Sequence, residues 1–140
     1  PTQILDFTNL RELDLSKNRL KIIPPQIGGL SNLEVLNLDR NRLESLPEEI
    51  GLLHNLRYLK LSRNRLYSLP IGIGNLSNLK ELILWSNGIK YFPESFRQLD
   101  STIEVIDLRN NPMMLYDDQQ AIKEMLPTPI IKMDKVCNCQ

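Results

Sequence analysis

Five prolines recur at a fixed interval of 23 residues, and this period constrains the fold of the 140-residue chain more than any other feature. They are Pro1, Pro24, Pro47, Pro70 and Pro93. Self-similarity at a fixed period of about 20 to 50 residues is typical of one small structural unit stacked on copies of itself. Because one unit cannot bury its apolar face alone, neighbouring units must share a continuous core. The period therefore predicts a solenoid, which offers an extended binding surface rather than a catalytic pocket.

Apolar residues and one asparagine recur at fixed places between the prolines. Their spacing is L-x-x-L-x-L-x-x-N-x-L, with isoleucine or methionine replacing some of the leucines. Five copies occur, at residues 10–20, 33–43, 56–66, 79–89 and, one residue late, 103–113. The pattern resembles the leucine-rich repeat family over about residues 1–113. The 23-residue unit is similar to the typical intracellular class, found in Ras-pathway and scribble-like scaffolds and in bacterial proteins.

This resemblance implies a fold and a kind of activity. The fold is an α/β solenoid, curved, with short parallel strands on its concave face, loops or short 3₁₀ turns on its convex face, and a C-terminal cap. The usual activity of the family is protein binding, here expected of a cytoplasmic scaffold or adaptor in signalling. The resemblance does not carry over a named partner, because the concave residues differ between members.

The residues of one unit fit this fold physically. The x-L-x-L segment alternates with the period of a strand that has one buried face. Apolar residues three and six places after each proline suit a 3₁₀ turn that begins at the proline. Each asparagine can both donate and accept hydrogen bonds, so a stack of them can satisfy backbone groups turned inward after each strand. We assign this structural role to one asparagine per unit, namely Asn18, Asn41, Asn64, Asn87 and Asn111.

The period divides the chain into three parts. Residues 1–113 are predicted to form the repeats, with strand-bearing units that start near 10, 33, 56, 79 and 103. Residues 114–134 are predicted to form a cap, with a helix at 117–125 that turns Ala121, Ile122 and Met125 toward the last coil. Tyr116, Leu126-Pro127 and Asp134 loosely resemble the intracellular capping motif of the family. Residues 135–140 are expected to be a tail.

The two ends of the chain raise separate questions. Residues 1–10 align with residues 24–33, so the chain starts inside a repeat, and we expect a fragment of a longer protein. The alternative is a natural start whose apolar side docks on a partner or on another copy. Cys137 and Cys139 are too few for a zinc site, and a disulfide between them would be strained. Extracellular members of the family carry disulfide-rich caps, so a reducing, cytoplasmic compartment is favoured.

Composition excludes several classes of function. Lysine plus arginine equals aspartate plus glutamate, 17 of each, so the formal net charge is zero, which argues against nucleic-acid or membrane-surface binding. No apolar run approaches the about 20 residues of a membrane span. The chain has no Gly-rich phosphate loop and no nucleophile motif, and His54 is its only histidine. We therefore expect neither enzymatic activity nor a cofactor.

Residues between the inward leucines should form columns on the concave face. The columns read Glu12, Val35, Tyr58, Glu81, Val105, then Asp14, Asn37, Lys60, Ile83, Asp107, then Ser16, Asp39, Ser62, Trp85, Arg109. All three phenylalanines, Phe7, Phe92 and Phe96, fall at predicted core positions, whereas the single tryptophan falls on this face. An exposed patch of Ile83, Trp85 and Tyr58 predicts protein contact. The alternative is that Arg109 stacks on Trp85 and merely shields it.

Two further columns are basic. They are Lys17, Arg40, Arg63 and Arg19, Arg42, Arg65. Six cations on one edge of the first three units can bind an acidic or phosphate-bearing partner. The alternative is a solvated face that Asp39, Glu34 and Glu44 partly neutralise. The predicted partner-binding residues are Tyr58, Lys60, Ile83, Trp85, Arg109, Arg40, Arg63, Arg42 and Arg65.

Two other functions stay open besides the scaffold. The chain can be the recognition domain of a larger enzyme, such as a deadenylase, cyclase or phosphatase. It can also be part of a secreted or surface receptor or effector, which a Cys-bearing N-terminal cap upstream would favour.

Overall fold

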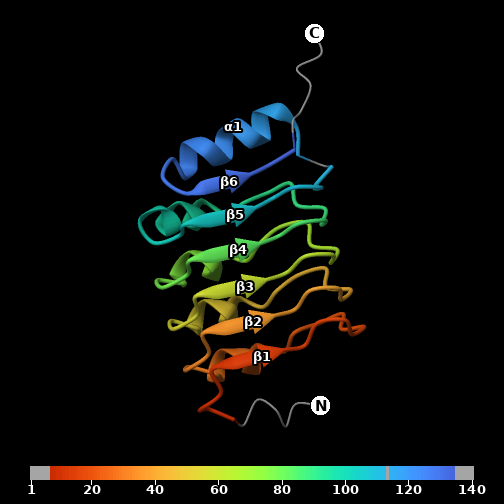
Figure 1. Ribbon diagram of the computed structural model, residues 1–140, viewed down its shortest axis with the longest axis vertical. Coiled ribbons are helices and arrows are strands. Elements are labelled where there is room, and N and C mark those ends of the chain that lie inside the picture. The colour runs from red at the N-terminus through yellow and green to blue at the C-terminus, as the bar shows by residue number, and fades with distance from the viewer. Residues whose placement is uncertain (1–6, 113, 135–140) are drawn as a thin grey trace.

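The computed structural model describes residues 7–112 and 114–134, which form a stack of coils with one strand in each (Figure 1). The strands pair in parallel in the order of the sequence, so each coil contacts its chain neighbours. They are β1 (Glu12–Asp14), β2 (Val35–Asn37), β3 (Tyr58–Lys60), β4 (Glu81–Ile83), β5 (Val105–Asp107) and β6 (Ile130–Lys132). The predicted strands and their register are confirmed, because the pairing joins Glu12 to Val35, Val35 to Tyr58 and so on along each column. We call the strand-lined side the concave face.

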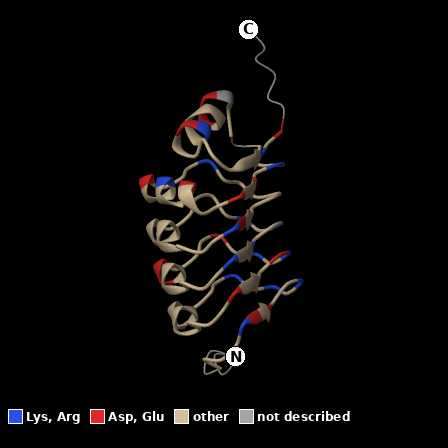
Figure 2. Ribbon diagram, turned by 60° about the vertical axis from the view of Figure 1, so that its left-hand side comes forward, with Lys and Arg blue, Asp and Glu red and all other residues tan. Residues whose placement is uncertain are grey.

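Short 3₁₀ helices lie on the opposite, convex side of the stack (Figure 2). They are η2 (Pro25–Gly29), η3 (Glu48–Leu52), η4 (Ile71–Asn75) and η5 (Glu94–Ser101). Each is preceded by one of the periodic prolines, Pro24, Pro47, Pro70 and Pro93, with φ between −71° and −67°. The prolines thus start the predicted turns, because their fixed φ suits the entry and their missing N–H is not needed there. In the described ranges, no helix is long and apolar enough to cross a membrane.

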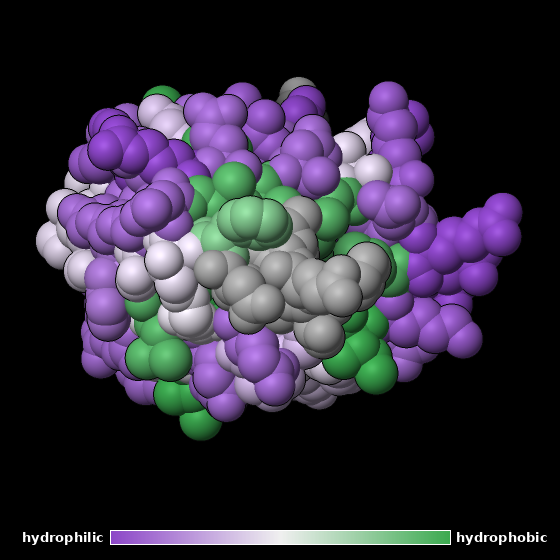
Figure 3. Space-filling view, turned by 90° about the horizontal axis from the view of Figure 1, so that it is seen from below, coloured by the Kyte–Doolittle hydropathy of each residue, from purple (hydrophilic) through white to green (hydrophobic). Residues whose placement is uncertain are grey.

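The repeated leucines and isoleucines form one continuous core between the two layers. Leu36, Leu59 and Leu82, one from each of three successive strands, are fully buried. Seen from the N-terminal end, the surface shows hydrophobic residues in several places, some of them around the centre, among mostly hydrophilic residues (Figure 3). The core prediction for Phe7 is wrong, because this side chain is 62% exposed where no described coil lies outside it. Phe96 is buried as predicted, and Phe92 packs partly buried against the core.

The asparagine ladder is confirmed in its interior. Asn87 donates from Nδ2 to the carbonyl oxygens of Leu61 and Leu84, at 2.9 and 3.1 Å. Its Oδ1 accepts the backbone N–H of Leu66 at 3.1 Å, so one side chain joins two coils. Asn41, Asn64 and Asn111 make the corresponding bonds. Asn18 is the exception, because it is exposed and donates only to carbonyls of its own coil.

Glycines allow the 3₁₀ helices of successive coils to approach closely. A methyl group at Gly74 would overlap the backbone carbonyl of Ser95 in the next coil, and one at Gly72 would overlap that of Glu48. In the same layer, the Glu48 carboxylate accepts the N–H groups of Ile71 and Gly72, at 3.1 and 2.6 Å. The first turn of η4 therefore has its free N–H groups satisfied by the preceding coil.

The cap consists of α1 (Tyr116–Met125) and the edge strand β6, with α1 lying above β6 in Figure 1. The predicted helix is present and is one residue longer than expected. Its residue Ile122 is buried, as predicted. The inward position of Ala121 is wrong, because Ala121 is exposed while Gln119 is buried. Strand β6 had no counterpart in the sequence prediction. The side chain of Tyr116 and residues Cys137 and Cys139 lie outside the described residues.

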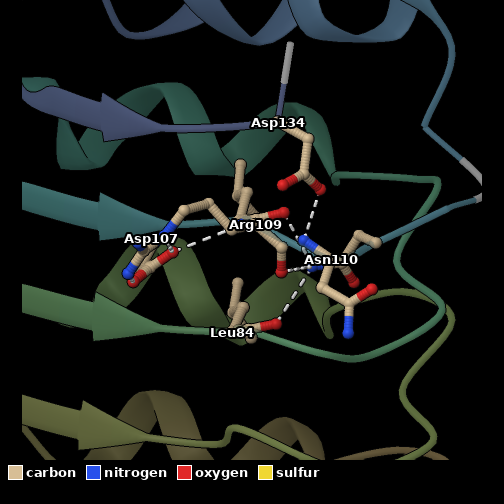
Figure 4. Close-up of polar contacts among 7 residues, drawn as sticks. Leu84, Asp107, Arg109, Asn110 and Asp134 are labelled. Atoms are coloured by element: carbon tan, nitrogen blue, oxygen red, sulfur yellow. Dashed lines mark hydrogen bonds and ion pairs between the residues drawn. The ribbon is translucent and has the colours of Figure 1, made fainter. Parts of the chain in front are cut away.

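Two aspartates attach the cap to the last repeats. Asp100, which belongs to the one-residue insertion before the fifth unit, accepts the backbone N–H and the hydroxyl of Thr128 at 2.9 and 3.0 Å. Asp134 accepts the backbone N–H of Asn110 (Figure 4). In the earlier coils, the corresponding N–H donates to a backbone carbonyl of the next coil, as Arg40 does to Ser62. The Asp134 carboxylate therefore replaces the carbonyl of a coil that would follow.

Candidate functional site

The concave face carries one apolar and aromatic area, centred on the fourth coil. Ile83 and Trp85 lie at the end of β4 and just beyond it, and both are half-buried. In the pairing register, Lys60 is opposite Ile83, and Tyr58 is opposite Glu81 in the same two strands. The structure therefore brings these predicted residues onto two adjacent coils. We call Tyr58, Ile83 and Trp85 the apolar patch.

Trp85 is covered on one face by Arg63 rather than by Arg109. The guanidinium carbon of Arg63 lies 4.6 Å from the centre of the Trp85 ring, within the range of a cation–π contact. Arg63 comes from the preceding coil, and its backbone N–H donates to the Trp85 carbonyl at 2.8 Å. The guanidinium thus contacts one face of the indole, which is half-buried.

Arg109 instead pairs with the carboxylate of its own strand (Figure 4). Its Nε donates to Asp107 Oδ1 at 2.9 Å and its Nη2 to Oδ2 at 2.6 Å. The predicted alternative, in which Arg109 shields Trp85, is wrong, because the cation over the ring is Arg63 and Arg109 pairs with Asp107. Asp107 belongs to an outward column but is nevertheless buried, beside this pair with Arg109. Arg109 itself stays exposed.

Three aspartates of this face differ in environment. Burial acts to raise the pKa of Asp107, but hydrogen bonds and charge from Arg109 outweigh it, and the pKa is lowered. Burial raises the pKa of Asp39, although its carboxylate accepts the N–H of Ser62 at 2.6 Å. Hydrogen bonds from Ser16 lower the pKa of the exposed Asp14. Compared with an ordinary aspartate, Asp107 and Asp14 therefore favour the charged form more, and Asp39 favours it less.

The six predicted cations lie at the loops that follow the strands, and we call them the basic rim. Its members are Lys17, Arg19, Arg40, Arg42, Arg63 and Arg65, all exposed. Figure 2 shows Lys and Arg recurring along this loop edge of the stack. Among the described residues, none of the six forms an ion pair; Glu34, expected to neutralise the rim, contacts Arg11 at 3.6 Å instead. Asp39 and Glu44, also expected to neutralise part of the rim, form no ion pair within 4.0 Å in the described ranges.

One column of the rim has an uncommon backbone conformation. Lys17, Arg40 and Arg63 have φ of 57°, 57° and 54°, in the left-handed region. Ser86 and Asn110 share this conformation at the same place in the next two coils, so the turn itself requires it. Asparagine and glycine adopt left-handed φ more readily than lysine or arginine. The chain therefore carries long cationic side chains where shorter residues would fit the turn better.

Replacing Arg40 with asparagine is expected to raise the free energy of unfolding by about 0.5 to 1 kcal/mol, because asparagine pays less for left-handed φ. Urea unfolding followed by circular dichroism would measure it. The matched control is Arg42→Asn, which removes a neighbouring rim charge at a residue without positive φ. An equal gain in both variants would assign the effect to charge and contradict the backbone explanation.

One exposed aromatic pair was missed by the sequence prediction. Tyr67 and Tyr91 are 46% and 54% exposed, and their rings meet edge to face with centres 5.3 Å apart. They follow the asparagine turns and lie outside the three concave columns. Their spacing of 24 residues, close to the 23-residue period, places them on neighbouring coils. The spacing alone does not show that their rings are in contact.

Comparisons with known proteins agree with this architecture. Two family models described as leucine rich repeat match the sequence, over residues 8–66 and 78–99. A search of curated proteins gave no match. Among solved structures, the chain is similar to an LRR protein of Leptospira interrogans, with a TM-score of 0.75 and 30% identity over 94% of this chain. It is also similar to the PEPR1–AtPEP1 structure, with a TM-score of 0.66 and 33% identity over 76% of this chain. The matches cover 39% and 16% of those chains, so this sequence spans less than half the length of either.

Proposed function

Because this chain belongs to the leucine-rich repeat family, we propose that it is a protein-interaction module whose partner binds the concave face over the apolar patch. The observation that carries the proposal is the exposed part of Trp85, held in place by Arg63 at 4.6 Å. Tryptophan and arginine are the residue types enriched among those that dominate binding energy at protein interfaces. A scaffold or adaptor in the cytoplasm is the setting we propose for this binding.

The surroundings of Trp85 support a binding role over a purely structural one. Its ring is partly fixed before any partner arrives, so less side-chain entropy is lost on binding. Ile83 adds apolar area beside it on the same coil, and Lys60 and Arg109 are charged neighbours. An apolar centre with a charged border is the usual anatomy of a protein interface. Two other settings for this binding, the recognition part of a larger enzyme and a surface receptor, remain alternatives.

Replacing Trp85 with alanine is expected to weaken partner binding by about 30-fold, the effect of a residue worth about 2 kcal/mol at an interface. The partner would first be captured on the immobilised chain and then titrated by calorimetry. Ile83→Ser should weaken binding by a smaller factor, of about 5 to 10.

The control variant is Tyr91→Ala, which removes an exposed aromatic ring away from the concave face. It should bind the partner with the affinity of the unchanged chain. Thermal unfolding of each variant would show that it is folded. Unchanged affinity in a folded Trp85→Ala variant would overturn the proposed function.

A further inference from the structure

We propose that the basic rim is a second contact site of the same module, which binds an acidic segment of the partner protein. The segment would be rich in aspartate and glutamate and would run along the stack across the first three coils. This inference rests on the proposed function in one respect, that the partner is a protein. It is supported by observations that the proposed function does not use, namely the ion pairing, the spacing and the backbone conformation of the rim.

The first observation is that no ion pair engages the rim cations, a property that they share with Lys21, Arg57, Lys60, Lys90, Lys123 and Lys132 among the described residues, whereas four other cations are paired. Arg11, Lys80, Arg97 and Arg109 each lie within 4.0 Å of a carboxylate. In the described part of the chain, none of the six rim residues does. Because the chain as a whole has a net charge of zero, the rim does not reflect a generally basic protein. Its charges are left available for carboxylates that another molecule brings.

The second observation is the regular geometry of the rim. Lys17, Arg40 and Arg63 occupy the same place in three successive coils, with Arg19, Arg42 and Arg65 two residues further along. Paired strands lie about 4.8 Å apart, so the first and third coils are separated by about 10 Å. An extended chain advances about 3.3 Å per residue and turns alternate side chains to the same side, so carboxylates two residues apart, about 6.6 Å from each other, can both face the long rim side chains of neighbouring coils. Arginine on the second and third coils can hold such carboxylates by two hydrogen bonds each.

The third observation is that the rim is bounded. The same two places hold Ser86 and Gly88 in the fourth coil, so the positive columns stop at the coil that carries Ile83 and Trp85. Arg63 of the rim contacts the apolar patch, because it lies over the ring of Trp85. An acidic segment on the rim is therefore continuous with an apolar anchor on the patch. The partner sequence expected from this layout has an acidic stretch beside an apolar or aromatic residue.

The fourth observation is that the left-handed turn favours glycine or asparagine over the lysine and arginine of the rim. Coils four and five use Ser86 and Asn110 there, whereas the first three use lysine or arginine. Residues kept in sparsely populated backbone conformations gather at functional sites. The charge at these turns is therefore better explained by contact with a ligand than by the needs of the fold.

The surroundings favour an acidic protein segment over a nucleic acid. Asp14 and Asp39 lie on the concave face beside the rim, three residues before Lys17 and one residue before Arg40. A continuous polyanion that spread from the rim onto this face would meet these carboxylates. A short acidic segment that stays on the rim avoids them. The charge pattern thus fits a short acidic segment that binds along the rim over about three coils.

The test is an NMR titration of the ¹⁵N-labelled chain with octaglutamate in low-salt buffer. Octaglutamate is expected to shift the backbone amide signals of Lys17, Arg40 and Arg63, and octaglutamine to leave them unchanged. A triple variant, Arg40→Gln, Arg42→Gln and Arg65→Gln, keeps the Arg63–Trp85 contact and should lose about tenfold or more in affinity, because binding depends on the charges removed.

The matched control removes the same number of charges from paired residues, by Arg11→Gln, Lys80→Gln and Arg97→Gln. It should change the affinity by less than about twofold, since these cations are already engaged. Equal losses in both triple variants, or no shift at the rim, would overturn the proposal. So would tighter binding of an eight-nucleotide single-stranded DNA than of octaglutamate.

A further variant separates this proposal from the proposed function. Ile83→Ser alters the apolar patch and leaves all six rim charges, so it should bind octaglutamate with unchanged affinity. If the patch variants retain the partner while octaglutamate still binds the rim, the concave-face proposal fails and the rim proposal stands. If octaglutamate does not bind while Trp85→Ala loses the partner, the rim proposal fails and the concave-face proposal stands.

Discussion

Replacing Asn87 with alanine is expected to lower the free energy of unfolding by about 3 kcal/mol, one of the largest single effects in the chain. The buried N–H of Leu66 would lose its acceptor, and the carbonyls of Leu61 and Leu84 would each lose one of two asparagine donors. An unsatisfied buried donor costs about 1 to 3 kcal/mol, and each lost hydrogen bond adds about 1 kcal/mol. Denaturant unfolding followed by circular dichroism would measure the change.

The natural control is Asn18→Ala at the same place in the first coil. Asn18 is exposed and bonds only to the carbonyls of Leu15 and Ser16, which water can solvate after the change. We expect a loss below about 1 kcal/mol. Equal losses for Asn18 and Asn87 would show that the ladder stabilises the turn of each coil by itself and does not join neighbouring coils.

Replacing Gly74 with alanine is expected to destabilise the chain by a similar amount, about 3 kcal/mol, because the added methyl group would overlap the carbonyl of Ser95. Relief of the overlap requires η4 and η5 to move apart, which opens the buried contact between two coils. The change would be measured by the same unfolding experiment.

The control for this substitution is Gly29→Ala. Gly29 ends η2, and nothing lies within 4 Å of the position of its added methyl group. This variant should be neutral, or more stable by up to about 1 kcal/mol, since alanine restricts the unfolded chain more than glycine does. A destabilisation by Gly29→Ala equal to that by Gly74→Ala would contradict the overlap argument.

The fold could be predicted from the sequence because every coil obeys the same rule. A buried leucine, a buried asparagine or an outward residue in one unit fixes the place of its counterparts 23 residues away. This is why Ile83 and Trp85 could be assigned to the concave face from sequence spacing alone, and why the strand register follows from the same count. The repeat rule does not hold at the ends of the array, where Phe7 has no described neighbouring coil and Ile130–Lys132 follows no repeat.

Contacts made by side chains within the site were harder to predict. The columns show that Arg63 and Arg109 both flank Trp85, one coil to either side, but not which guanidinium lies over the ring. The outcome depends on Asp107, which holds Arg109 on its own coil. It depends also on the left-handed turn at Arg63, which directs that side chain across the coil boundary. Neither rotamers nor backbone turns follow from the repeat period.

The Asp134 carboxylate has a consequence for how molecules of this protein meet one another. Inside the array, each left-handed turn accepts a hydrogen bond from one neighbouring coil and donates one to the other, so the series has no internal reason to end. Asp134 accepts the last N–H, that of Asn110, but a side-chain carboxylate has no N–H with which to continue the series. This column of hydrogen bonds is thus closed within one chain. A second molecule stacked on the C-terminal end could not extend it, which disfavours growth of the solenoid into a fibre from that end.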